Sequence, residues 1–250
     1  MKVQSKHVLT SEGLQYHLHI KPGDIGKYVF LPGDPFRTDK IAAYLDHAEL
    51  VAHNREHKTW TGYLEGVKVS VCSTGMGCPS TAIAAEELIH AGATTLIRVG
   101  TSGRVSQQSM NPEYQGVIIT GAVRDEGTTY QYVPEGYPAI ADRHIVDCLV
   151  KAAEESGYQF AEGITQTKDS FYGELDPDSM PVSGRLKERF EAFRKAGVMA
   201  TEMECAALFV IADIRGVRAG GIMSYEEMKD CVIKTAVEGM RKIILEDRKK

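Results

Sequence analysis

Cysteine is scarce in this sequence and follows no pattern typical of a disulfide framework or a metal site. The 250-residue chain has five cysteines, an odd number, and they are scattered. None forms a C-x-x-C pair or has the spacing from histidine that zinc sites use, so we expect free thiols in a reducing cytoplasm and no metal site. Cys72 and Cys205 lie in apolar runs, where packing in the core is the favoured interpretation.

Long hydrophobic runs and an excess of basic residues are also missing. No apolar run approaches the length of a membrane span, and the first residues, MKVQSKHVLTSEG, lack the apolar segment of a signal peptide. The net charge is -5 with acids and bases mixed along the chain, so no basic stripe suggests nucleic acid. We therefore expect a soluble, cytoplasmic protein that binds a small molecule and has neither nucleic acid nor membrane as a partner.

What the sequence does contain is an alternation of short apolar segments and amphipathic ones. With 43% hydrophobic and 25% charged residues and no linker or repeat, residues 1–250 are predicted to form a single domain. The predicted fold class is α/β, a central mixed β-sheet flanked by helices in a three-layer sandwich. The predicted strands are 28–31, 67–73, 94–101, 117–123, 198–203 and 217–223, and the predicted helices are 35–45, 79–90, 143–156, 186–195, 205–214 and 226–245.

Three predicted strands end in glycine-rich segments that suit an anion, and ligands of α/β sheets collect at such strand ends. The first, LPGDPFR, contains Gly33 and Arg37, and the second, STGMGCPS, spans 73–80. The third, LIRVGTSG, contains Arg98 and Thr101, and a buried guanidinium needs an anionic partner. Each segment also has a structural explanation: a surface turn, tight strand–helix packing, or a buried Arg–Asp pair. Together they favour an oxyanion ligand such as phosphate.

The stretch ATEMECAAL, residues 200–208, places two carboxylates close together. If it is a strand, Glu202 and Glu204 share one face and Met203 points to the other. Two carboxylates at a strand end suit hydrogen bonds to the vicinal hydroxyls of a ribose. A general acid/base pair, half of a metal site, and acids that stabilise a helix N-terminus are the alternatives.

Six short motifs in a fixed order now make the sequence resemble a known family. They are PGDP-x-R at 32–37, N-R-E-x-x-T-W at 54–60, STG-x-G-x-PS at 73–80, RVGTSG at 98–103, DSFY at 169–172 and EME at 202–204. Each motif alone is a weak signal, but their order over about residues 16–218 is specific. The chain resembles the nucleoside phosphorylases, and most closely the uridine phosphorylases.

The resemblance implies a pentosyltransferase that cleaves a nucleoside, uridine first, with inorganic phosphate to give the base and (deoxy)ribose 1-phosphate. Phosphate is the co-substrate, and no metal or other cofactor is implied. The resemblance implies that Gly33, Arg37, Arg98 and Thr101 hold phosphate, joined by Arg55 from a neighbouring subunit, and that Arg98, Thr101 and Arg37 act in catalysis. It also implies a homodimer, or a hexamer built as a trimer of dimers, with active sites shared between subunits.

The resemblance also assigns the nucleoside side of the site. Glu204 would bind the ribose hydroxyls, Met203 would pack against the sugar, and His17 would reach the ribose 5'-hydroxyl across the subunit interface. Phe171 would stack on the base, and Glu174 would bind its edge.

The base side departs from the uridine phosphorylase pattern. Glu174 stands at the position of a glutamine and Ser179 at that of an arginine, both of which pair with uracil in the family. The acids Glu174, Asp176 and Asp178 are expected to repel negative charge on a departing uracil. The late strand ends at about 223 and passes quickly into the last helix, so the base-side wall is expected to be short, with 124–132 as a candidate replacement.

These departures leave three other interpretations open. The base preference could be altered, since Glu174 accepts hydrogen bonds from an amino or N–H group. The chain could be a binding homologue that has lost turnover. A nucleosidase that uses water is disfavoured, because it would not need three arginines for phosphate.

Overall fold

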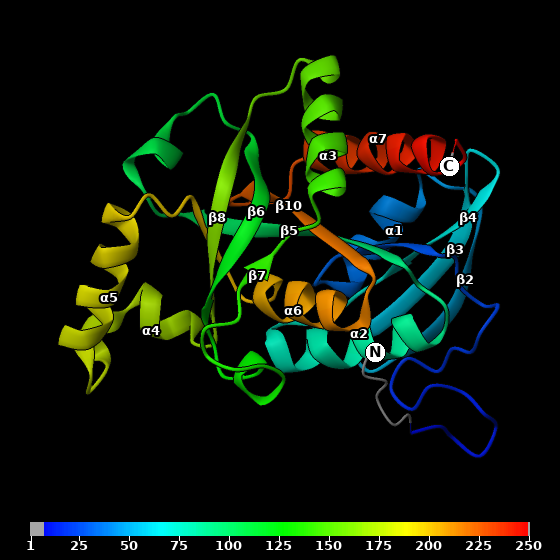
Figure 1. Cartoon of the computed structure of the whole chain (residues 1–250), viewed down its shortest axis with the longest axis horizontal. Coiled ribbons are helices and arrows are strands. Elements are labelled where there is room, and N and C mark those ends of the chain that lie inside the picture. The colour runs from blue at the N-terminus through cyan, green and yellow to red at the C-terminus, as the bar shows by residue number, and fades with distance from the viewer. Residues whose placement is uncertain (1–7, 250) are drawn as a thin grey trace.

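A mixed sheet of ten strands runs through residues 8–249, the part of the chain described by the computed structural model (Figure 1). Residues 1–7, the start of the segment in which we looked for a signal peptide, lie outside this range. The strands are β1 (Tyr28–Leu31), β2 (Asp46–Asn54), β3 (His57–Leu64), β4 (Val67–Cys72), β5 (Thr95–Arg104), β6 (Gly116–Asp125), β7 (Ala139–Ile140), β8 (Phe160–Lys168), β9 (Ala200–Glu202) and β10 (Arg218–Tyr225). The helices are α1 (Pro35–Ala42), α2 (Cys78–His90), α3 (Arg143–Ser156), α4 (Phe171–Leu175), α5 (Ser183–Lys195), α6 (Cys205–Arg215) and α7 (Asp230–Asp247).

The strand order brings the glycine-rich strand ends together. The order is β10-β6-β8-β9-β5-β1-β4-β3-β2, and β1 is parallel to both β4 and β5. In this register Leu31 lies beside Arg98. Because β10 also pairs with β5, the strands β5, β10, β6, β8 and β9 close into a ring. The carboxyl ends of β1, β4 and β5 therefore share one edge, where loops can form a site.

Helices cover the sheet on both faces, as the three-layer prediction requires. In Figure 1, α2 and α6 lie on one side of the sheet and α1, α3 and α7 lie on the other. One core cluster contains the apolar side chains of α2 and α6, and a second contains those of α1, α3 and α7. Helix α3 shows why the sequence folds this way locally: Asp142 caps its first turn, and Gly157 ends it with a left-handed backbone.

Every predicted element has a counterpart in the structure, with most boundaries within three residues, but several elements were missed or differ more, and the short elements β7 and α4 are among those that were not predicted. The polar hairpin β2–β3 and strand β8 were not predicted, because their side chains do not form apolar runs. The predicted strand 198–203 is only β9, because the backbone turns into α6 after Glu202. The last helix begins at Asp230, four residues later than predicted, since Glu226 has a positive φ that a helix does not allow.

Gly116 is a position where the sheet tolerates no side chain. A Cβ added there would lie 2.0 Å from the carbonyl oxygen of Met223 on the paired strand β10. We expect Gly116→Ala to lower the free energy of unfolding by about 2–3 kcal/mol, as overpacking does. Urea denaturation measures this, with Gly136→Ala as the control, since a Cβ there would meet nothing within 4 Å. Equal stability of the two variants would contradict the prediction.

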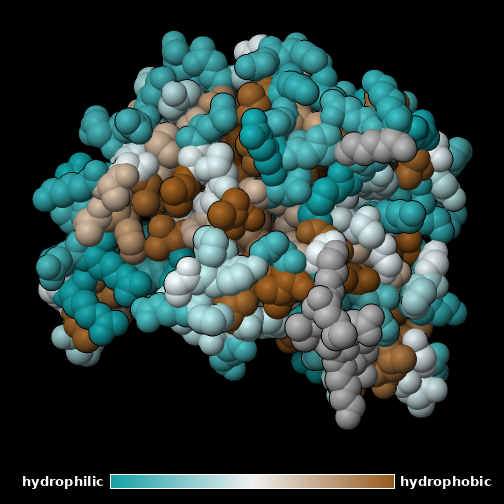
Figure 2. Space-filling view, viewed as in Figure 1, coloured by the Kyte–Doolittle hydropathy of each residue, from teal (hydrophilic) through white to brown (hydrophobic). Residues whose placement is uncertain are grey.

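No helix within residues 8–249 has the length and apolar character needed to cross a membrane. Figure 2 shows hydrophilic side chains over much of the visible face, with apolar ones between them.

Candidate active site

A cleft of about 940 Å³ opens at the shared edge of β1, β5 and β9 and extends to α4 and α5. Its lining includes side chains from segments that are far apart in the sequence. Of the ten predicted site residues, eight line this cleft: Gly33, Arg37, Arg98, Thr101, Phe171, Glu174, Met203 and Glu204.

Arg98 lies at the base of the cleft and is only 4% exposed. Its Nη1 donates to the carbonyl oxygen of Leu31 and to the hydroxyl of Thr74, both at 3.3 Å. Its Nη2 donates to the carboxylate of Glu204. Burial is the largest single influence and lowers the pKa of Arg98, but the charges of its acidic neighbours, Glu204 first, and its hydrogen bond to Glu204 together hold the pKa above its usual value. The buried ion pair that the sequence left open therefore exists, with Glu204 as the partner.

Arg98 nevertheless retains a donor. Its Nε is buried and has no hydrogen-bond partner among the described residues. A buried N–H without a partner costs free energy, so the protein groups around Arg98 leave its guanidinium incompletely satisfied.

Arg37 approaches Arg98 from the first turn of α1, whose N-cap is Asp34. Burial, and then the charge of Arg98, lower the pKa of Arg37 below its usual value. Two guanidinium groups that repel each other across one cleft are stabilised when an anion lies between them. Thr101 adds a hydroxyl to the same lining.

Gly33 allows close approach to this pair. A Cβ at Gly33 would lie 3.4 Å from both Nη atoms of Arg98 and 3.3 Å from the carbonyl oxygen of Gly75. We expect Gly33→Ala to raise the KM for phosphate about tenfold, because the added methyl group crowds the bound anion. Steady-state kinetics at saturating nucleoside measures this. Gly184→Ala is the control, since a Cβ there would meet nothing within 4 Å, and an equal KM in both variants would contradict the prediction.

The two carboxylates of the EME motif have different environments, which corrects the predicted shared face. Glu202 accepts from the backbone N–H groups of Glu204 and Cys205, both at 2.8 Å, and so holds the start of α6. Burial and the charge of Glu204 raise the pKa of Glu202. Glu204 accepts from the N–H of Gly77 at 2.8 Å and from Arg98. Glu202 therefore stabilises the start of α6, as the helix-terminus interpretation predicts. Glu204 instead joins the glycine-rich segment 73–80 to Arg98 inside the cleft.

The far end of the cleft contains a cation that was not predicted. The ammonium of Lys168 donates to Glu174 at 2.8 Å and to the hydroxyl of Thr201 at 2.6 Å, and all three residues line the cleft. Phe171 lines the same end and is 53% exposed. Lys168 was missed because its strand, β8, was not predicted, although it directly precedes the DSFY motif.

The expectation that Glu174, Asp176 and Asp178 together repel a departing base is wrong. Glu174 is paired with Lys168. Asp178 pairs with Lys187, and neither Asp176 nor Asp178 lines the cleft. Ser179, at the position of the family's arginine, does not line it either.

The late strand extends two residues further than predicted, to Tyr225, and residues next to its end line the cleft. Strand β10 ends at Tyr225, and Glu226 and Arg104 line the cleft. The guanidinium of Arg104 lies 4.0 Å from the centre of the Tyr225 ring and donates to backbone carbonyls of the 109–114 segment. The candidate replacement, 124–132, contributes nothing to the lining. Arg104 and Glu226 therefore contribute to the wall of the cleft beside the end of β10.

His17 and Arg55 do not line the cleft of their own chain. The ring Nδ1 of His17 lies 2.6 Å from a carboxylate oxygen of Glu87, and the carbonyl oxygen of His17 accepts from Asn54 at 2.7 Å. Arg55 follows Asn54 in the turn between β2 and β3 and is exposed, with a φ of 53°. The segments that carry the two residues assigned to a neighbouring subunit's site are thus joined by the hydrogen bond from Asn54 to His17.

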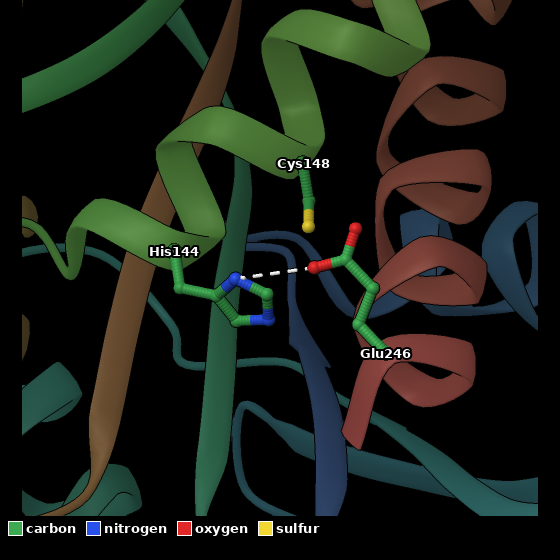
Figure 3. Close-up of side chains that lie close together, drawn as sticks. All are labelled: His144, Cys148 and Glu246. Atoms are coloured by element: carbon green, nitrogen blue, oxygen red, sulfur yellow. Dashed lines mark ion pairs between the residues drawn. The ribbon is translucent and has the colours of Figure 1, made fainter. Parts of the chain in front are cut away.

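Among the described residues, one group of three possible metal ligands occurs between α3 and α7, and none of its members lines the cleft. Figure 3 shows His144 and Cys148, one turn apart on α3, facing Glu246 of α7. The ring of His144 lies 3.5 Å from one carboxylate oxygen of Glu246, and Lys151 lies 3.7 Å from the other. Burial raises the pKa of the Cys148 thiol to about 11, so it keeps its proton at neutral pH. These contacts make the group an ion-pair cluster that joins α3 to α7.

Comparison with known proteins agrees with this geometry. The sequence profile of the phosphorylase superfamily matches residues 27–240. A uridine phosphorylase of Treponema pallidum is 43% identical over 255 residues, which cover 95% of this chain and 97% of the relative. A uridine phosphorylase of Thermococcus kodakarensis is 44% identical over 87% of this chain and 79% of its own, and a guanosine phosphorylase of Halorubrum lacusprofundi is 38% identical over 85% and 83%. A cleft at the predicted strand ends, a matching profile and relatives over most of the chain lead to one conclusion: this chain belongs to the phosphorylase superfamily.

Proposed function

We propose that this chain catalyses the phosphorolysis of a nucleoside, uridine first, to free base and (deoxy)ribose 1-phosphate. The observation that carries the proposal is the contact between Arg98 and Glu204 inside one cleft. It joins a cation suited to phosphate to a carboxylate suited to ribose hydroxyls. Inorganic phosphate is the co-substrate in this proposal, and the reaction uses no metal or other cofactor.

Phosphate would lie in the corner formed by Gly33, Arg37, Arg98 and Thr101. A phosphate dianion can accept from both guanidinium groups and from the Thr101 hydroxyl, all of which line the cleft. When phosphate takes donors of Arg98, the carboxylate of Glu204 becomes free to accept from the ribose hydroxyls. Phosphate and nucleoside binding would therefore support each other.

The chemistry follows from this arrangement. Glycosidic cleavage passes through an oxocarbenium-like sugar, as in glycoside hydrolysis. The bond between C1' and the base nitrogen breaks, its electron pair leaves with the base, and a phosphate oxygen forms the new bond to C1'. A dianion held beside C1' stabilises the cationic sugar before it attacks, and the Glu204 contacts hold the sugar in position. Met203 would pack against the ribose and Phe171 against the base.

The active site would be completed by a second copy of this chain. His17 is hydrogen-bonded to Asn54, the residue before Arg55, neither His17 nor Arg55 lines the cleft of its own chain, and Arg55 is exposed. A homodimer, alone or as part of a trimer of dimers, would bring His17 to the ribose and Arg55 to the phosphate of the neighbouring site. The single domain predicted for residues 1–250 is the unit of this assembly.

A panel of nucleosides assayed with and without phosphate tests the proposal. We expect uracil release from uridine that requires phosphate and yields ribose 1-phosphate in equal amount. Release without phosphate would indicate a nucleosidase. Calorimetric binding of phosphate or nucleoside without turnover of any member of the panel would establish the binding homologue instead.

A purine substrate is the second candidate. Two carboxylates, Glu174 and Glu226, line the cleft and can accept from the N–H groups of a purine base. One of the relatives, 38% identical to this chain, is named a guanosine phosphorylase, which supports testing purine nucleosides. Guanosine and inosine in the same panel decide between the two bases.

A further inference from the structure

We propose that Lys168 and Glu174 recognise the base, and that Lys168 stabilises the negative charge on the departing base. This inference rests on the phosphorolysis proposed above. The pair selects bases with adjacent carbonyl and N–H groups, as in uracil, thymine, hypoxanthine and guanine. The cation at the base therefore comes from the end of β8, and no residue of the 176–179 segment supplies it.

Lys168 is placed where a base donor is needed. It is 8% exposed, yet it lines the cleft together with Glu174 and Phe171. Phe171 and Glu174 are three residues apart on α4, so they lie on the same side of that helix. A base stacked on Phe171 would present its edge to the pair formed by Lys168 and Glu174.

The pair offers a donor directly beside an acceptor. The ammonium Nζ lies 2.8 Å from a carboxylate oxygen of Glu174. Lys168 has three N–H donors, of which Glu174 and Thr201 accept two, and Glu174 is acceptor-only when ionised. A carbonyl oxygen would accept from Lys168 while the neighbouring N–H donates to Glu174. With cytosine, a carbonyl bound to Lys168 would bring an unprotonated ring nitrogen to the carboxylate, and adenine has no carbonyl.

The same contact acts on the leaving group. When the bond from C1' to the base breaks, its electron pair spreads from the ring nitrogen onto the carbonyl oxygens. A fixed ammonium beside such an oxygen favours the transition state over the bound nucleoside. Lys168 keeps its proton in this step, and solvent protonates the base after release.

A chain of side chains behind Lys168 fixes its position. Thr201 lies 3.1 Å from the amide oxygen of Gln166, and the Gln166 amide nitrogen donates to Asp125 at 2.7 Å. Asp125 in turn pairs with Arg189 of α5. The ammonium is therefore held from the strand side and directed into the cleft, which is the arrangement that preorganised catalysis requires.

Lys168→Met, with Lys187→Met as the matched control, tests the proposal. Lys187 pairs with Asp178 outside the cleft, so its loss should leave turnover unchanged. For Lys168→Met we expect kcat/KM for uridine to fall about 100-fold or more, with the KM for phosphate within threefold of wild type. Thermal melting checks that the variant is folded, and Lys168→Gln, which keeps a neutral donor, serves if it is not.

A nucleoside with a better leaving group separates catalysis from a structural role. Fluorine at position 5 of uracil withdraws electrons, so the base needs less help to carry negative charge. The loss caused by Lys168→Met should therefore be several-fold smaller on 5-fluorouridine than on uridine. An equal loss on both substrates, or unchanged uridine kinetics, would overturn the proposal for Lys168. Absence of turnover in the wild-type protein would instead overturn the proposed function.

The base selectivity is tested with the wild-type enzyme and Glu174→Gln. Wild type should cleave nucleosides of oxo bases and reject cytidine and adenosine. Glu174→Gln should lower kcat/KM for uridine, because an amide replaces the carboxylate that accepts from the base N–H. Efficient cleavage of cytidine by the wild-type protein would contradict the proposed selectivity for oxo bases.

Discussion

Replacing Arg98 with methionine should reduce kcat/KM for phosphate by about 10³-fold or more, the size of effect seen when a preorganised charge contact to a transition state is lost. Arg98 is the buried member of the two-guanidinium corner, and its Nε has no other partner among the described residues. Methionine keeps the length of the aliphatic stem but removes every donor. Phosphate saturation kinetics at fixed nucleoside measures the effect, and nucleoside binding followed by calorimetry should change much less.

The same substitution also affects stability, and this must be separated from the kinetic effect. Loss of Arg98 leaves the buried carboxylate of Glu204 without its cation, which costs about 3–5 kcal/mol when one member of a buried pair is removed. The double variant Arg98→Met/Glu204→Gln removes both charges, so it should regain much of the stability and still lack phosphate-dependent turnover. Recovery of activity together with stability would show that Arg98 has only a structural role.

Replacing Arg55 with alanine should lower kcat/KM for phosphate by about 10²-fold while leaving the free energy of unfolding within about 0.5 kcal/mol of wild type, as for exposed side chains. Arg55 is exposed in the turn between β2 and β3 and does not line its own cleft. An effect on turnover would thus have to act on a neighbouring subunit. The exposed Lys195→Ala provides a control for the loss of a surface charge.

Mixing the Arg55→Ala and Arg98→Met variants tests directly whether Arg55 acts on a neighbouring subunit's site. A hybrid dimer of Arg55→Ala and Arg98→Met has one site with both defects and one with neither. Refolding or co-expressing the two variants should therefore restore up to half of the activity per hybrid. Activity in the mixture no higher than the sum of the separate variants, in a sample shown by sedimentation to contain hybrids, would contradict the shared site.

The structure changes the interpretation of the acidic segment after Phe171. From the sequence, Glu174, Asp176 and Asp178 form a cluster that would oppose a negatively charged leaving base. In the structure, Lys168 compensates Glu174, and Asp178 is paired with Lys187 away from the cleft. The base end of the cleft therefore has a donor and an acceptor side by side.

Local patterns determined a large part of this protein. The alternation of short apolar and amphipathic segments identified β1, β4, β5 and β10, and it predicted both ends of α3 correctly. Glycine-rich segments at parallel strand ends located the cleft, because parallel strands must bring those ends to one edge. These features depend only on neighbouring residues, so they are visible in one chain without a structure.

Only the tertiary structure decided which charges meet. Arg98 and Glu204 are 106 positions apart, and no local pattern relates them until the ends of β5 and β9 come together. Lys168 and Glu174 lie six positions apart, but a turn between β8 and α4 brings them into contact, which neither a strand nor a helix period predicts. The energy of a charge depends on its partner and its burial, and both arise from the packing of distant segments. The sequence alone therefore located the anion site. The fold decided how that site is neutralised, where the base-side cation comes from, and that neither His17 nor Arg55 lines its own cleft.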